Sequence, residues 1–571
     1  MQKLLTIDRF QGMADKGCYF VQSMKPVFVG GKVLLEQYGY ITKARQKGDA
    51  NLANLDVIEG WTVREENAVY QMYAIDKGCR VYKGQSANNL YQFAEQHHSS
   101  DDDVKYPDIA QDLNGDIIYV TQRYLAHLVG TVWTDTWHDL NEGSAVYPQF
   151  TGQEAQSGWR RQIDIWDKLH LIGNGNYLAA YTGDGTDFAA DYKKLHYLYQ
   201  FSCMAHNSSQ LLVGANKDGK GAIFLWDGWS DGWPNKIDFS NKVNSIKPYG
   251  SGWIVQTGTK ILYTNGYSYK EIATVPDTED DWAFGIAPNG MLILENNIII
   301  LPEGDFITRR KGGAWIFDLS TESWNFLPYQ QDSNSWGIYN CVGGAIFFES
   351  WLNNIYLGYS TESYYTNPYF AGSLSLLKST SNSSVILPLI NFGKEVQMDK
   401  ITLSVINNLK SLSQYTDSSC KIILSLSDNK SMIWKYAQAS AVSTEKSKIK
   451  IDGTVSGYNQ AEVGEEIWIL NGKNAGNRRF ITAITGKDTA TEVWTLDSDL
   501  PELTEANITM NVLPFRKYGM EPKTLTGNQT EKMEFYVSDF LSEQCFLQIE
   551  IEQTNFPIQI EKVELKISMA E

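Results

Sequence analysis

One repeated unit dominates the chain between about Tyr70 and Leu377. Short runs of β-forming residues alternate there with Gly, Asn and Asp turns, and the runs carry Trp or Tyr. Fourteen of the 17 Trp residues lie between Trp61 and Trp351. Serial antiparallel hairpins at a nearly constant period are typical of a β-propeller. The repeat therefore predicts an all-β fold but leaves function open, because propellers serve enzymes, lectins and structural rings alike.

The repeat divides into about seven units, which predicts a propeller of about seven blades over residues 59–378. We expect the units to begin near Gly60, Val104, Arg160, Tyr199, Asn241, Asp277 and Asn334. Dipeptides that tolerate the positive φ of a tight hairpin turn lie inside these units. Two-residue turns are accordingly predicted at Asn114-Gly115, Asn174-Gly175, Asp218-Gly219, Asn265-Gly266 and Asn289-Gly290.

The flanks of the repeat differ from it. Residues 1–58 hold short hydrophobic clusters between glycines, which predicts an extended N-terminal arm that docks on its own propeller or on a neighbouring subunit. Residues 379–436 and 516–571 contain alternating runs such as Ile401, Leu403 and Val405, which indicate the half-buried strands of a discontinuous β-sandwich. Residues 437–515 form a compact unit of their own, predicted to be an inserted small barrel of the SH3 or OB type.

Charge and cysteine content narrow the function classes. The formal net charge is −18, and no basic stripe is present, so a protein that grips nucleic-acid phosphates is not expected. The acidity suits either simple solubility or a lumen through which DNA slides without sticking. The six Cys show no Cys-x-x-Cys spacing, which predicts free thiols in a reducing compartment. No signal peptide and no membrane span are expected, because no apolar run has the required length.

Candidate catalytic and metal-binding residues are sparse. A glycosidase needs two carboxylates facing one sugar bond, and the acids available in one stretch are Asp164, Asp167, Asp184, Asp187 and Asp191. Neither the Asp-box turns of sialidase-type propellers nor a Walker loop or nucleophile elbow is present. The chain is therefore predicted not to be an enzyme and to need no cofactor.

Metal ligands show no recognisable spacing either. The segments Asp184-Gly185-Thr186-Asp187 and Asp101-Asp102-Asp103 do not follow the EF-hand pattern, and loop roles are favoured for them. His97 and His98 adjoin the second of these segments and are expected in a loop. The other five His show no ligand motif, so structural roles are expected and no metal site is predicted.

The sharpest local cluster is the run Trp226-Asp227-Gly228-Trp229-Ser230-Asp231-Gly232-Trp233. Indole rings beside carboxylates are how lectins hold sugars, because C–H faces stack on the rings while hydroxyls reach the acids. The alternative is that these Trp residues wedge between blades or cap a hairpin. Glycan binding through Trp226, Asp227, Trp229, Asp231 and Trp233 is therefore kept as a hypothesis.

Two short motifs lie near the N-terminus: Phe10-Gln11-Gly12 and Gly39-Tyr40-Ile41-Thr42-Lys43-Ala44-Arg45. They resemble the opening of tailed-bacteriophage virion proteins that carry a β-propeller. The stretch Val385–Val405, with Asn391-Phe392-Gly393, is similar to the sandwich that follows the propeller in such proteins. The region Gly464–Leu496 looks like a small barrel of other phage tail proteins. As an ordering of domains, the resemblance covers most of the chain.

The resemblance implies a structural tail component, such as a nozzle or an adaptor-proximal ring protein. The implied partners are copies of the same chain in a homo-oligomeric ring, other tail, adaptor or portal-proximal proteins, and viral DNA that passes without specific binding. The implied location is the virion tail, assembled in a host cytoplasm. Two alternatives remain open: a host-surface glycan-binding tail protein and, less favoured, a propeller-type glycoside hydrolase.

Overall fold

The structure is a computed structural model, and every element it describes with regular hydrogen bonding is a β-strand. No helix able to cross a membrane occurs in the part of the chain that is described. The described residues are 2–7, 20–22, 24–29, 32–37, 40–46, 55–66, 68–85, 91–94, 104–121, 123–140, 159–196, 198–275, 285–302, 313–319, 322–328, 341–350, 354–361, 369–375, 383–387, 390–407, 419–428, 435–454, 461–469, 473–474, 477–526, 530–552 and 558–569.

The chain divides into two compact units. The first comprises Met1–Ile41, Trp315–Ile338 and Ser375–Glu571, and the second comprises Thr42–Ala314 and Tyr339–Leu374.

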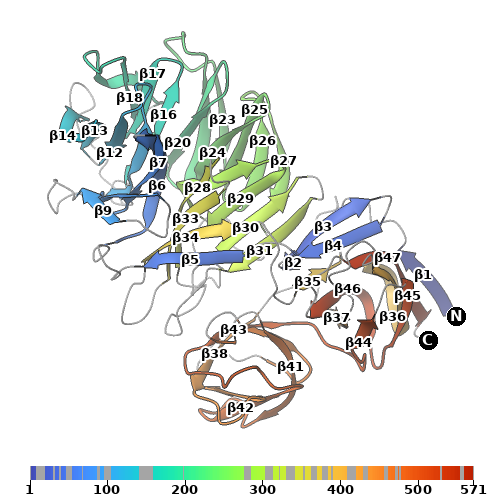
Figure 1. Cartoon of the computed structure of the whole chain (residues 1–571). Helices are drawn as coiled ribbons and strands as arrows, with labels where there is room; N and C mark the ends of the chain where they lie inside the picture. Colours follow the sequence, from blue (N-terminus) through green and yellow to red (C-terminus); the bar gives the residue numbers. More distant parts are fainter. Residues whose placement is uncertain are drawn as a thin grey trace. The chain divides into compact units, whose positions relative to one another are not determined.

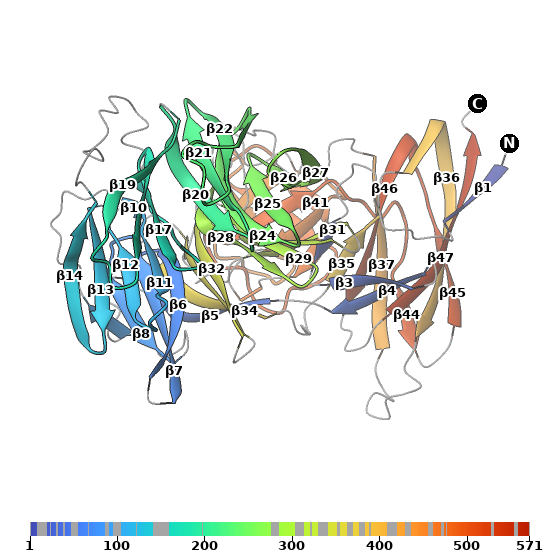
Figure 2. The same cartoon turned by 90° about the horizontal axis from the view of Figure 1, so that it is seen from above.

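The second unit holds a series of antiparallel sheets, each built from strands that follow one another in the chain (Figures 1 and 2). The first sheet contains β6 (Ile58–Glu66), β7 (Val69–Asp76), β8 (Val81–Gly84) and β9 (Tyr91–Ala94); the second β11 (Asp108–Gln111), β12 (Ile117–Val120), β13 (Tyr124–Val129) and β14 (Val132–Asp139); and the third β16 (Ile163–Trp166), β17 (Leu169–Asn174), β18 (Tyr177–Thr182) and β19 (Ala189–Lys194). The fourth sheet contains β20 (Gln200–His206), β21 (Leu211–Lys217), β22 (Lys220–Trp226) and β23 (Asn235–Phe239), and the fifth β24 (Val243–Tyr249), β25 (Gly252–Thr257), β26 (Lys260–Thr264) and β27 (Tyr269–Thr274). Then follow the hairpin β28 (Ile286–Leu294) and β29 (Asn297–Pro302), and the last sheet with β32 (Cys341–Glu349), β33 (Asn354–Thr361) and β34 (Tyr369–Ser375). A short parallel pair, β10 (Val104–Tyr106) and β15 (Trp159–Arg160), lies outside this series.

The first strands of these sheets form a closed ring. Each of β6, β11, β16, β20, β24, β28 and β32 packs against the next, and β32 packs against β6. The last sheet takes its fourth strand, β5 (Tyr40–Gln46), from before the first sheet; Figure 1 shows β5 beside β34. Seven inner strands around one axis make this unit a β-propeller, which confirms the predicted all-β propeller fold.

Apolar side chains fill the spaces between neighbouring sheets. One buried cluster joins the first and second sheets, and three more join the second to the third, the third to the fourth and the fourth to the fifth. A further cluster joins the last sheet to the first and includes Trp61, Tyr82, Ala345 and Tyr356. Because both faces of each sheet are covered, the strands read as continuous apolar runs rather than strict alternation.

Of the five predicted two-residue turns, Asp218-Gly219 is one, because Lys217 and Lys220 pair directly across it. Asn114-Gly115 and Asn265-Gly266 lie in longer loops between paired strands, and Asn174 is the last residue of β17, paired with Tyr177, so that the turn there begins at Gly175. The four glycines concerned all take positive φ: Gly115 (85°), Gly175 (63°), Gly219 (78°) and Gly266 (85°). The fifth prediction was wrong, because Asn289 and Gly290 lie inside β28, at an irregularity in its pairing with β29. A Cβ on Gly290 would meet the Ala287 carbonyl oxygen at 3.0 Å, so the glycine serves close backbone approach rather than a turn.

The first unit contains a β-sandwich, as predicted. Its strands are β1 (Gln2–Ile7), β2 (Phe20–Gln22), β3 (Met24–Val29), β4 (Lys32–Gln37), β35 (Ser383–Ile386), β36 (Ile390–Asn407), β37 (Ser419–Ser427), β44 (Lys523–Thr526), β45 (Thr530–Tyr536), β46 (Leu541–Glu552) and β47 (Ile558–Met569). The two further strands β30 (Gly313–Asp318) and β31 (Ser323–Pro328) lie next to each other in one sheet, and none of their described residues belongs to the sandwich core. The predicted inward residues Ile401, Leu403 and Val405 are fully buried in its core. The segment predicted as an extended arm contributes β1 and β4, both paired with β47.

A closed barrel is inserted between β37 and β44. Its strands are β38 (Lys435–Ala441), β39 (Lys448–Ile451), β40 (Glu466–Ile469), β41 (Arg478–Thr485), β42 (Glu492–Leu496) and β43 (Thr509–Leu513), in the order β38-β39-β42-β41-β40-β43. Its core includes Ile467, Trp494 and Met510. The assignment of this barrel to the SH3 or OB type stays a prediction.

Candidate functional site

The propeller axis holds a cavity of about 320 Å³, and all seven inner strands contribute to its wall. Its apolar lining includes Trp61, Met204 and Phe347. Its polar lining consists of Gln162, which directly precedes β16, and five side chains from five inner strands: Asp108, Asp164, His206, Lys247 and Asn289. A concave site with a few convergent polar groups at the axis of a propeller is the natural place for a small ligand.

Asp108, the first residue of β11, connects three inner strands. Its Oδ2 accepts a hydrogen bond from the Ile163 backbone N–H (2.8 Å), and its Oδ1 accepts one from Asn289 Nδ2 (2.8 Å). Asn289 Oδ1 in turn accepts from Gln162 Nε2 at 3.3 Å. Both oxygens of the Asp108 carboxyl are therefore engaged in holding β11, β16 and β28 together, which makes it an organiser of the cavity.

Burial dominates the acid–base properties of this group. It raises the pKa of Asp108 to about 7, although the hydrogen bonds from Ile163 and Ile109 and the charge of Lys247 act in the opposite direction. Burial also lowers the pKa of Lys247, against the charges of Asp108 and Asp164. Perturbed titratable groups facing one cavity are a mark of functional sites.

Three groups remain to meet a ligand. Among the residues whose positions are described, Lys247 Nζ has one hydrogen bond, a long one to Asn289 Oδ1 at 3.5 Å. Asp164 Oδ1 is 2.8 Å from His206 Nδ1, and this hydrogen bond raises the pKa of His206. Asp164 Oδ2 is buried with no hydrogen-bond partner among the described residues. An ammonium, an imidazole and a carboxylate oxygen can together bind a small polar molecule that carries both donors and acceptors.

A second, open cavity of about 960 Å³ adjoins the axial one, because His206 and Pro248 line both. We call it the outer groove. Its wall comes from the turns after β16, β20, β22 and β24 and includes Lys168, Asn207, Asp227 and Trp229.

The structure separates the five residues of the predicted glycan cluster. Trp226 is buried between the third and fourth sheets, and its indole N–H donates to the Ser230 carbonyl oxygen at 2.9 Å. The Trp233 indole N–H donates to the Lys194 carbonyl oxygen at 2.9 Å. The Lys193 ammonium lies 4.6 Å from the Trp226 ring and 5.0 Å from the Trp233 ring. Trp226 and Trp233 are thus packed within the protein. This agrees with the alternative interpretation, in which the Trp residues wedge between blades or cap a hairpin.

Asp227 and Trp229 do reach the outer groove, whereas Asp231 is exposed and does not line it. Asp227 accepts hydrogen bonds from Ser230 Oγ (2.6 Å) and from the backbone N–H groups of Ser230 and Trp229, which lower its pKa to about 2. The Trp229 side chain projects from this fixed turn and is 91% exposed. Glycan binding by the predicted residues therefore stays a prediction. Of the five residues, only Asp227 and Trp229 line the outer groove.

The acids considered for hydrolysis do not gather in one pocket. Asp164 lines the axial cavity and Asp167 lines the outer groove. Asp184 and Asp187 bond to Thr186 and Thr182 within their own turn. Asp191 lies in β19. His97, His98 and Asp101–Asp103 lie outside the described residues.

Sequence reasoning missed Asp108, Lys247 and Asn289. Each lies on a different inner strand, and no spacing in the chain connects them. A faint signal was present: polar residues at the inner positions of otherwise apolar strands, such as Asp108 beside Ile109. Without knowledge of which strand is innermost, that signal does not distinguish an axial residue from an edge residue.

No model of a protein family matches the chain, and no curated protein matches it either. Solved structures with a similar fold include a gluconolactonase from Xanthomonas campestris, with 11% identity, a TM-score of 0.30 and coverage of 64% of this chain and 98% of that one. They also include the Dos1 propeller, with 10% identity, a TM-score of 0.33 and coverage of 61% and 92%. The chain is a β-propeller protein, and these similarities say nothing about its activity.

Proposed function

We propose that this β-propeller protein is a structural, non-catalytic component of a bacteriophage tail, assembled as a ring around the path of the DNA. The observation that carries the proposal is the closed ring of inner strands in the propeller. These seven strands line a cavity of about 320 Å³ at the axis, and β5 completes the last sheet. Such a propeller is a rigid block, so a DNA path has to run between several copies rather than through one.

Charge and sequence motifs support the same proposal. The net charge of −18 repels phosphates, which suits a passage that DNA crosses without binding. The resemblance to propeller-bearing virion proteins rests on motifs at both flanks, of which Tyr40–Arg45 falls in the closing strand β5.

Two measurements test this proposal together. We expect native mass spectrometry of the purified chain to show a discrete homo-oligomer. In electron micrographs, we expect labelled antibodies to bind at one end of the phage virion. A monomer at all concentrations together with particles that carry no label would contradict it. The acidic-lumen part of the proposal further requires that DNA is not retained by the oligomer at low salt.

A second candidate function rests on Trp229. An indole that is 91% exposed beside the Asp227 carboxylate, at the edge of a groove, offers the stacking face and the acceptor that a saccharide needs. We propose that the outer groove binds a host-surface glycan.

A glycan array tests this candidate with a matched pair of variants. Wild type is expected to bind at least one glycan, and Trp229→Ala to lose about tenfold or more in affinity because the stacking face is gone. Tyr267→Ala removes another exposed aromatic, 60% exposed and outside the groove, and is expected to bind like wild type. A negative array for wild type, or unchanged binding by Trp229→Ala, removes the candidate.

A further inference from the structure

Asp112, Asp116 and His127 bring three ligand atoms to one place in the second propeller sheet. These atoms all lie within 4.8 Å of one another. His127 Nε2 is 3.5 Å from Asp112 Oδ2 and 3.8 Å from Asp116 Oδ2. The Asp112 side chain is 1% exposed, and among the residues with described positions His127 Nε2 has no hydrogen-bond partner and no contact with solvent. Two carboxylates and an imidazole thus converge at one place, where Asp112 is buried and Asp116 and His127 are partly buried.

The separations differ from those of an ordinary histidine–aspartate hydrogen bond. The same propeller contains such a bond, between His206 Nδ1 and Asp164 Oδ1, at 2.8 Å. The two separations around His127 are longer by 0.7 Å or more. Ligand atoms bound to one tetrahedral Zn²⁺ at 2.0–2.2 Å are about 3.4 Å apart. The separation of 3.5 Å between His127 Nε2 and Asp112 Oδ2 is therefore close to that of two atoms bound to one ion.

The hairpin between β11 and β12 holds the two carboxylates in place. The Asp112 backbone N–H donates to the Asp116 carbonyl oxygen at 2.8 Å. Asp112 Oδ1 accepts from the N–H groups of Asn114 and Asp116, both at 2.8 Å. These bonds engage Oδ1 and leave Oδ2 directed at His127. In the register of β12 and β13, His127 is opposite Ile118, so Asp116, two residues earlier, lies on the same face.

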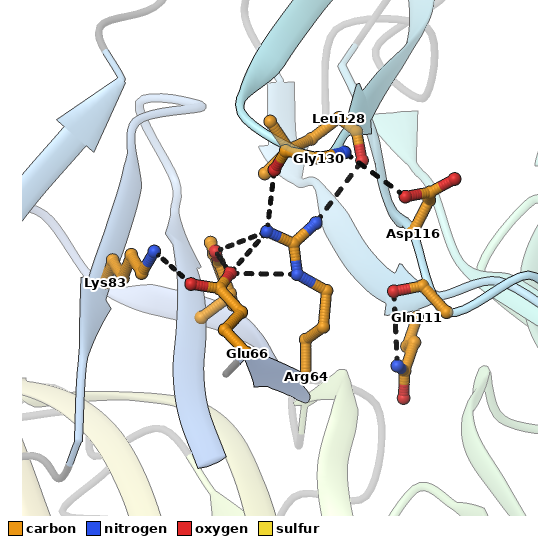
Figure 3. A network of polar contacts seen from close by, with 9 residues as sticks. Arg64, Glu66, Lys83, Gln111, Asp116, Leu128 and Gly130 are labelled. Carbon is orange, nitrogen blue, oxygen red and sulfur yellow. Dashed lines mark hydrogen bonds and ion pairs between the residues drawn. The ribbon is translucent and has the colours of Figure 1, made fainter. Parts of the chain in front are cut away.

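Neighbouring backbone and side-chain groups also hold Asp116 and His127 in place. Figure 3 shows Asp116 beside Gly130, whose N–H donates to Asp116 Oδ1 at 3.4 Å. The Gly130 carbonyl oxygen accepts from Arg64 Nη2 at 2.9 Å, and Arg64 is itself paired with Glu66. The His127 ring stacks on Trp137 with a centroid separation of 4.2 Å. A site whose ligands are held by such surrounding contacts needs little rearrangement to bind an ion.

We propose that Asp112, Asp116 and His127 bind a divalent transition-metal ion, for which Zn²⁺ is the appropriate probe. One imidazole and two carboxylates suit Zn²⁺ or a related ion, whereas Ca²⁺ and Mg²⁺ favour ligand sets of oxygen alone. Three protein ligands leave a coordination position for water, and Asp116, whose side chain is 22% exposed, is the least buried of the three. This site is separate from the axial cavity and independent of the proposed tail role.

Calorimetric titration of the full chain, first freed of metal with a chelator, tests the proposal. We expect one Zn²⁺ to bind per chain with micromolar or tighter affinity, and no comparable binding of Ca²⁺ or Mg²⁺. His127→Gln and Asp116→Asn are each expected to weaken Zn²⁺ binding by about 100-fold or more. X-ray absorption at the zinc edge should show only nitrogen and oxygen ligands.

The controls separate this site from adventitious binding. His196→Gln changes a histidine that lies edge-to-face against Tyr199, outside the cluster, and is expected to bind Zn²⁺ like wild type. Circular dichroism checks that each variant is folded. If only one of His127→Gln and Asp116→Asn folds, its Zn²⁺ affinity alone is compared with that of wild type. Unchanged affinity in a folded ligand variant, tighter binding of Ca²⁺ than of Zn²⁺, or no Zn²⁺ binding at about 1 mM would each overturn the proposal.

Discussion

Replacing Gly344 with Ala is expected to lower the free energy of unfolding of the propeller by about 3 kcal/mol or more. Gly344 lies in β32, where the last sheet meets the first. An added Cβ would lie 2.1 Å from the Ile58 carbonyl oxygen and 2.7 Å from Val57 Cγ1. The first of these atoms is backbone of the inner strand β6, so the clash can be relieved only by moving strands at the point where the ring closes.

Urea unfolding followed by circular dichroism measures this effect. Gly232→Ala is the matched control, since its added Cβ would have no atom within 4 Å and its φ needs no glycine. We expect this control to stay within about 0.5 kcal/mol of wild type. Equal stability of the two variants would show that the contact between β32 and β6 does not limit the packing of the ring.

Replacing Asp108 with Asn is expected to change the pH dependence of stability. The pKa of Asp108 is about 7 in the folded protein and 3.8 in its ordinary state. Between these values the folded protein keeps a proton that the unfolded chain has released, so the contribution of Asp108 to stability is largest at low pH and falls as the pH rises toward 7. The full effect is bounded at about 4 kcal/mol. The Asn side chain does not titrate, so this part of the fall should disappear.

Denaturation of both proteins at several pH values between 4 and 8 gives the comparison. We expect the stability difference between wild type and Asp108→Asn to shift in favour of the variant as the pH rises. Asp184→Asn serves as the control, because hydrogen bonds from Thr186 lower the pKa of the exposed Asp184. That group therefore contributes stability only above its ordinary pKa, and its removal should leave the fall toward pH 7 intact. A parallel fall in Asp108→Asn and wild type would contradict the role of burial.

Local patterns in the sequence were enough to predict the propeller and the sandwich. Asn114-Gly115 and Asn265-Gly266 form turns because short-range backbone geometry decides them. The alternation of Ile401, Leu403 and Val405 reflects one sheet face on a core. These features depend on residues that are close in sequence, which is why periodicity detects them.

The candidate sites depend on residues that are far apart in the chain. Asp108 and Asn289 meet across the axis although 181 positions separate them. Asn289-Gly290 was misread as a turn because the same dipeptide also suits a bulged inner strand. Trp226 and Trp229 are three residues apart, yet one is 3% and the other 91% exposed. Whether each of two such close residues is buried depends on how neighbouring sheets pack, and the spacing of residues in the sequence does not specify that packing.

The position of β5 in the chain also has a consequence for synthesis. Its partner strand β34 begins at Tyr369, so β5 leaves the ribosome more than 300 residues before the sheet that it completes. At ~5–20 residues per second, this delay is roughly 15 to 60 s. During that interval β5 is an unpaired strand, and the forming propeller has an open seam. The same strand that completes the finished ring therefore leaves the nascent chain with an unpaired sheet edge until its last sheet emerges.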